Sequence, residues 1–80
     1  MEIHIGNLPK SYTEEELMET FQQFGEIESC KIIIDHVTGD SKGCGFVTMK
    51  NDIDGQKAID ELDGNEIDGH IIFASKARKE

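Results

Sequence analysis

The chain has 80 residues, of which 17 are Asp or Glu and 8 are Lys or Arg, so its formal net charge is −9. We expect one small domain over residues 1–80, and no apolar run approaches the ~20 residues that cross a membrane. The acidic balance argues at first against a nucleic-acid partner, because a basic surface is the usual electrostatic signature of such proteins.

Four strands and two helices are predicted along the chain. The first helix begins after Thr13, which has capping-box spacing to Glu16, and Gly25 is its expected C′ residue. The second helix is capped by Asp52 and stopped by Gly64. The predicted strands are residues 3–5, 30–34, 44–49 and 70–75.

The order strand, helix, strand, strand, helix, strand favours an α+β fold of the β-α-β-β-α-β, ferredoxin-like type. In it, two helices pack on one face of a four-stranded antiparallel sheet and the other face is open. The acids fall in two blocks, residues 13–28 and 51–69, each with a net charge of −6. Both blocks contain a predicted helix, so we expect the acids behind the sheet and an open face accessible to anions.

Two segments resemble the signatures of the RNA recognition motif. Residues 3–8, Ile-His-Ile-Gly-Asn-Leu, resemble its six-residue signature, and residues 42–49, Lys-Gly-Cys-Gly-Phe-Val-Thr-Met, resemble its eight-residue signature. The resemblance covers nearly the whole chain, which is therefore identified as a member of this family, similar to its small single-domain RNA-binding proteins. It implies binding of single-stranded RNA on the open sheet face, without catalysis or a cofactor.

Alternation along the strands places the candidate side chains. Val47 and Met49 are expected inward, and Gly45 keeps the inward side thin where a helix approaches. His4 is expected on the open face of the neighbouring strand and shares a surface with Phe46. The open-face residues of the third strand are then Lys42, Cys44, Phe46, Thr48 and Lys50.

The family signatures imply roles for these positions. Phe46 and His4 are expected to stack on bases, and Lys42 to contact phosphate. Asn7 is a signature position to which we assign no specific role. The implied RNA-binding residues are His4, Asn7, Lys31, Lys42, Cys44, Phe46, Thr48, Phe73, Lys76 and Arg78.

The sequence departs from the family pattern where His4 and Cys44 replace aromatic residues. A base stacked on an aromatic ring contributes about 1–3 kcal/mol, so we expect weak binding, micromolar or poorer. Protonation would add a charge to the imidazole, which predicts stronger binding below about pH 6.5.

The last strand offers a compensating ring. Phe73 lies on the open face if Ile72 and Ala74 point inward, whereas a slip of one residue buries Phe73 instead. Lys76, Arg78 and Lys79 follow as a basic tail that either crosses the bound RNA or frays in solvent.

A protein-interaction function competes for the same face, because Ile33, Cys44, Phe46 and Phe73 would form an apolar patch suited to a partner or a second copy. An enzyme is not expected, since the loop 7–10 has no arginine to hold phosphate. Cys30 is expected inward and Cys44 outward, so no disulfide is expected. His4 and Cys44 could approach each other on the open face, but without a third ligand no metal site is expected. We expect a monomer without membrane association. It is expected in the cytoplasm, or in the nucleus if the chain is excised from a eukaryotic protein. The sequence is compatible with both a stand-alone protein and an excised domain.

Overall fold

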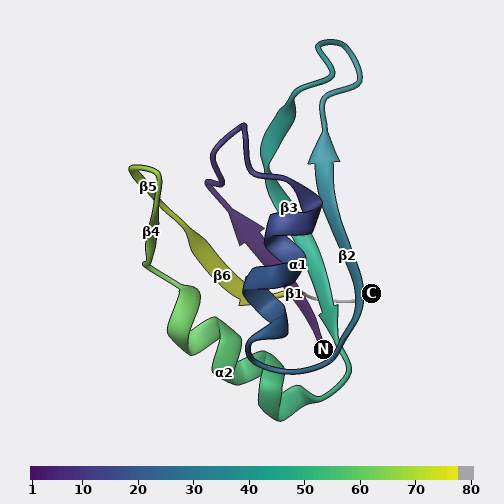
Figure 1. Cartoon of the computed structure of the whole chain (residues 1–80), viewed down its shortest axis with the longest axis vertical. Helices are drawn as coiled ribbons and strands as arrows, with labels where there is room; N and C mark the ends of the chain where they lie inside the picture. The colour runs from purple at the N-terminus through teal and green to yellow at the C-terminus, as the bar shows by residue number, and fades with distance from the viewer. Residues whose placement is uncertain (78–80) are drawn as a thin grey trace.

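A computed structural model describes residues 1–77, apart from the side chains of residues 41 and 42 (Figure 1). The elements in chain order are β1 (Glu2–Gly6), α1 (Glu14–Gln22), β2 (Ile27–Ile34), β3 (Ser41–Met49), α2 (Asp52–Leu62), β4 (Glu66–Ile67), β5 (His70–Ile71) and β6 (Phe73–Lys76). Four strands form one antiparallel sheet in the order β2-β3-β1-β6, and β4 pairs with β5 in a separate hairpin. The expected ferredoxin-like fold is confirmed.

Both helices lie on the same face of the sheet, and α1 crosses in front of β1 and β3 in Figure 1. The core lies between the two layers, because alternate residues of each strand point toward the helices. Its largest fully buried side chains are Phe21, Ile3, Ile5, Leu17, Met49, Ile72 and Val47. No described element covers the opposite face of the sheet, which we call the open face.

Gly45 of β3 lies where the sheet meets α1. A Cβ atom at this position would lie 2.6 Å from the carbonyl oxygen of Lys31 and 3.3 Å from Cδ2 of Leu17. Both distances are shorter than ordinary van der Waals contact. The structure therefore confirms that glycine is needed here for the close approach of strand and helix.

The capping box of α1 is present as predicted. The Thr13 hydroxyl accepts a hydrogen bond from the Glu16 backbone N–H, and the Glu16 carboxylate accepts one from the Thr13 N–H. The helix ends with Gln23 as its C-cap, so Gly25 lies one residue beyond the C′ position. Its missing side chain instead leaves room for the Asp54 carboxylate.

The prediction that Asp52 caps α2 is wrong by one residue. Asn51 is the N-cap, without a side-chain capping bond. Asp52 lies in the first turn, where its negative charge interacts favourably with the positive end of the helix dipole. At the other end, Gly64 adopts φ = 87° and stops the helix as expected.

The last predicted strand is two separate pieces. Residues 70 and 71 pair with residues 66 and 67, and only residues 73–76 join the main sheet. The cause is a tight turn at Asp68 and Gly69, whose φ angles of 48° and 83° suit a two-residue hairpin.

Candidate nucleic-acid interface

One row of residues crosses the middle of the open face. His4 of β1 is paired with Ser75 of β6 on one side and with Phe46 of β3 on the other. Phe46 is in turn paired with Lys31 of β2. Residues paired across antiparallel strands project to the same face of a sheet. We call Ser75, His4, Phe46 and Lys31 the central row, which unites three of the side chains predicted from the sequence.

The two rings of the central row contact each other. The ring centroids of His4 and Phe46 are 5.1 Å apart, and their planes are tilted by 56°. This separation lies in the range of attractive aromatic pairs. Both side chains are half-buried, so the pair forms a partly exposed ring surface that spans β1 and β3.

Phe73 lies on the open face, as expected. Its side chain is 58% exposed and that of Ile71 is 46% exposed, whereas Ile72 and Ala74 are buried. This pattern excludes the alternative register, in which a slip of one residue buries Phe73.

Gly6 lies between the Phe73 and His4 rings. It is paired with Phe73 at the end of the β1–β6 ladder. A Cβ atom on Gly6 would lie 3.8 Å from Cε1 of His4 and 4.0 Å from Cδ2 of Phe73. The rings of Phe73, His4 and Phe46 therefore follow one another across three neighbouring strands.

Thr48 and Cys44 flank the central row on β3. Thr48 is half-buried in the adjacent row, paired with Glu2 and Ser29. Cys44 is a half-buried free thiol and, as the neighbour of inward-facing Gly45, belongs to the open face. Cys44 thus occupies a position on the open face without providing a ring.

Asn7 ends strand β1. Its backbone has φ = 61°, in the left-handed region that asparagine tolerates better than most residues. Its side-chain Nδ2 donates a hydrogen bond of 2.8 Å to the Ile71 carbonyl oxygen. Sequence reasoning found the position but not this bond, because nothing local in the sequence indicates that Asn7 meets Ile71.

The basic candidates behave differently from one another. Lys76 belongs to β6 instead of a tail, and its register partner Ile3 points into the core, so the register assigns Lys76 to the helix side. The Lys42 side chain and Arg78 lie outside the described residues, and their phosphate contacts stay predictions. Lys31 is exposed at the end of the central row and has no ion pair with any described residue.

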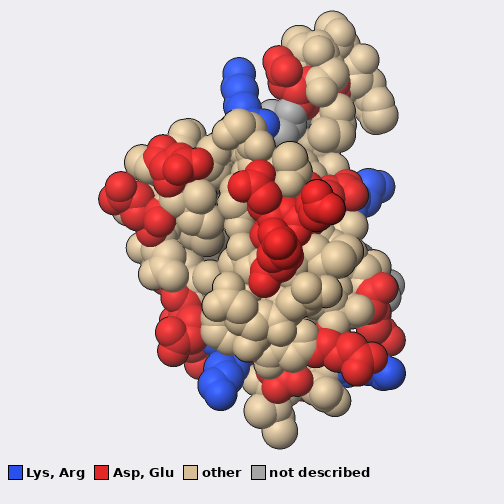
Figure 2. All heavy atoms as spheres, viewed as in Figure 1, with Lys and Arg blue, Asp and Glu red and all other residues tan. Residues whose placement is uncertain are grey.

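Acidic side chains gather on the helix side of the molecule (Figure 2). Directly after β3, the Lys50 ammonium donates a 3.1 Å hydrogen bond to the Glu26 carboxylate, and this bond raises the pKa of Lys50. The Lys50 charge is thereby partly neutralised, whereas Lys31 remains available to an anion.

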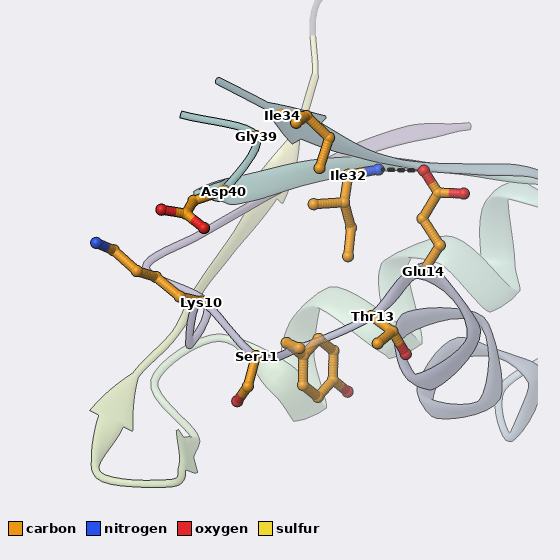
Figure 3. Close-up of a pocket in the computed structure, with 9 residues that line it drawn as sticks. Lys10, Ser11, Thr13, Glu14, Ile32, Ile34, Gly39 and Asp40 are labelled. Carbon is orange, nitrogen blue, oxygen red and sulfur yellow. Dashed lines mark hydrogen bonds between the residues drawn. The ribbon is translucent and has the colours of Figure 1, made fainter. Parts of the chain in front are cut away.

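A separate hollow of about 390 Å³ lies between the start of α1 and the edge of β2 (Figure 3). Tyr12 and Ile34 line it, together with Glu14, whose carboxylate accepts a 3.1 Å hydrogen bond from the Ile32 N–H. The Cys30 thiol donates to the Glu14 backbone oxygen, and burial followed by the Glu14 charge raises the pKa of this thiol to about 11. None of the predicted RNA-binding residues lines this hollow.

Within the described part of the chain, no three His, Cys, Asp or Glu residues are close enough together to hold a metal ion. None of the described helices has both the length and the apolar character needed to span a membrane.

The RNA recognition motif family matches residues 3–72 of this chain. The chain therefore belongs to that family, and the resemblance seen in its two signatures is confirmed.

Curated relatives are longer proteins. The chain is 45% identical over 74 residues to glycine-rich RNA-binding protein 10 of Brassica napus. The match covers 92% of this chain and 44% of that protein. It is 42% identical over 76 residues to the mitochondrial organelle RRM domain-containing protein 2 of Arabidopsis thaliana, covering 95% of this chain and 49% of the relative. The chain thus spans less than half the length of these relatives.

Solved structures share the fold over the whole chain. The RNA-binding protein PG1 superimposes with a TM-score of 0.95 at 38% identity, covering 100% of this chain and 96% of that one. A Sex-lethal protein–RNA complex superimposes with a TM-score of 0.93 at 33% identity, covering 99% of this chain and 47% of the other.

Proposed function

We propose that this chain is a single domain that binds a short segment of single-stranded RNA on its open face, without catalysis or a cofactor. The central row carries the proposal: the His4 and Phe46 rings lie side by side, and Lys31 follows at the end of the same row. Aromatic rings stack on bases of any sequence, and lysines contact phosphates. Membership of the family and the likeness to an RNA complex support the same function.

In the proposed complex, successive bases stack on Phe46 and His4, and Phe73 supplies a third ring on the β6 side. Lys31 and Lys42 contact phosphates, and Thr48 supplies a polar group beside the stacked bases. We expect the affinity to be micromolar or poorer, because Cys44 provides no ring and the net charge is −9. With about 2–4 phosphates engaged, the affinity should fall with salt at a shallow slope of roughly −0.7 per phosphate.

The proposal is tested by fluorescence anisotropy with a pool of short single-stranded RNAs of random sequence at low salt. Phe46→Ala should weaken binding roughly 5- to 150-fold, the equivalent of the about 1–3 kcal/mol that one stacked base contributes. The matched control is Ile53→Ala, since Ile53 is also an apolar residue but lies on α2 with 83% of its surface exposed. Equal affinities of Phe46→Ala and the unchanged protein would refute the proposal.

A second candidate function is docking of a protein partner or a second copy on the same face. The exposure of Phe73 and Ile71, at 58% and 46%, favours it, because neighbouring exposed apolar side chains often mark interaction surfaces. The RNA-binding proposal instead predicts a monomer. Sedimentation over a hundredfold range of protein concentration distinguishes the two functions. Self-association that Phe73→Ser abolishes, in a protein that does not bind RNA, would favour the protein partner.

We place the domain in the cytoplasm, or in the nucleus where it forms part of a longer eukaryotic protein. Imaging of the fluorescently labelled chain in its native cells tests this placement, and accumulation in an organelle would contradict it.

A further inference from the structure

The end of β1 is tied to the segment that carries Phe73. Asn7 leaves the sheet with φ = 61°, so the β1 backbone turns away from β6 directly after the Gly6–Phe73 pair. Its side chain then donates a 2.8 Å hydrogen bond to the carbonyl oxygen of Ile71, two residues before Phe73. The amide of Asn7 thus continues the attachment between the two segments beyond the last backbone pair.

Phe73 lies two residues beyond this attachment. Its side chain is 58% exposed and projects to the face opposite the buried Ile72 and Ala74, so the core holds its backbone but not its ring. The Phe73 and His4 rings lie on either side of Gly6, and a Cβ atom there would make only ordinary contacts with both. Movement of Ile71 away from Asn7 would shift Phe73 relative to His4.

We propose that Asn7 is a positioning residue of the RNA-binding face: its bond to Ile71 holds the Phe73 ring beside His4, so that the rings act as one surface. This inference rests on the proposed function. It assigns to Asn7 an effect on affinity that passes through Phe73, and therefore disappears when the Phe73 ring is removed.

A double-mutant cycle tests this dependence. Asn7→Gly removes the amide and keeps the left-handed backbone, because glycine adopts positive φ freely. We expect Asn7→Gly to weaken RNA binding about threefold in the protein with Phe73, as for the loss of one hydrogen bond. In the Phe73→Ala background the same change should alter the affinity by less than about 1.5-fold, since the two residues act as a unit.

The matched control is Asp68→Gly. Asp68 also has positive φ, at 48°, and its side chain makes no hydrogen bond to a described residue. This substitution should leave the affinity unchanged or slightly raise it, because it removes a negative charge.

Three results would overturn the inference. Equal losses in both backgrounds would mean that Asn7 contacts RNA directly. A lower melting temperature with unchanged affinity of the folded protein would mean a purely structural role. Unchanged ring chemical shifts of His4 and Phe73 in free Asn7→Gly would show that the Phe73 ring does not move.

The ring signals also separate this inference from the proposed function. If the unchanged protein binds no RNA but the His4 and Phe73 ring signals shift in Asn7→Gly, the proposed function fails and the positioning role stands. If the protein binds RNA through Phe46 and Asn7→Gly has no effect, only the positioning role fails.

Discussion

Replacing Gly45 with alanine should destabilise the domain strongly. The new Cβ would lie 2.6 Å from the Lys31 carbonyl oxygen, 3.3 Å from Cδ2 of Leu17 and 3.4 Å from Cα of Ile32. The shortest contact is with the backbone of β2, which cannot rotate away as a side chain does. Overpacking costs about 1–3 kcal/mol, and the backbone clash argues for the upper part, about 2–3 kcal/mol.

Urea unfolding followed by circular dichroism measures this loss. A domain of this size has a total stability of roughly 4–12 kcal/mol, so the variant should still fold, with a melting temperature lower by about 10–20 °C.

Gly6→Ala is the matched control, since Gly6 lies in β1 and faces the other side of the sheet. Its Cβ would meet His4 and Phe73 at 3.8 and 4.0 Å, which are ordinary contacts. We expect Gly6→Ala to change the free energy of unfolding by less than about 0.5 kcal/mol. Similar losses for Gly45→Ala and Gly6→Ala would refute the argument that the close approach to β2 and α1 requires glycine at position 45.

Three further predictions follow from the same structure. The pKa of Cys30 is raised from 9.0 to about 11, so the native state favours the neutral thiol and the free energy of unfolding should decline as the pH rises from about 9 toward 11. At pH 8 only about one Cys30 thiol in a thousand is then ionised. In the Cys44→Ser variant, where Cys30 is the remaining cysteine, iodoacetamide should therefore label the native protein slowly and the unfolded protein fast. Rapid labelling of the native protein would contradict the burial of Cys30. Glu14→Ala should lower the free energy of unfolding by about 1 kcal/mol, because the Ile32 N–H at the edge of β2 loses its acceptor. Glu15→Ala should have no such effect. Equal free energies of unfolding for the two variants in urea titrations would show that the bond does not stabilise the fold.

Patterns of buried residues were readable from the sequence because they repeat locally. Ile3 and Ile5, like Val47 and Met49, are completely buried at every second position, as alternation predicts. The two faces of β1 and β3 follow from these pairs, and the capping box places the start of α1. The open face and two rings of the central row were therefore predictable.

Features that depend on register or on very short elements were not predictable in the same way. The β4–β5 hairpin has strands of only two residues, too short to alternate, although Asp68-Gly69 is a recognisable turn signal. Ser75 joins the central row, and Lys76 falls on the other side, because of the β1–β6 register between distant segments. Lys31 aligns with Phe46 across a strand pair whose register shifts twice, which no local pattern indicates.

The net charge of −9 is a poor guide to the ligand of the open face, because charge acts over short distances in salt. At physiological ionic strength the Debye length is about 8 Å, so a bound anion responds mainly to the charges beside it. The two acidic blocks contain the helices, on the far side of the sheet from the central row. The row itself ends at Lys31, while Glu2 is the acid that the register assigns to the next row of the open face. Glu2→Gln should therefore strengthen RNA binding at 150 mM salt more than Glu15→Gln does, although both change the net charge equally; equal effects would mean that the whole molecule's charge governs binding.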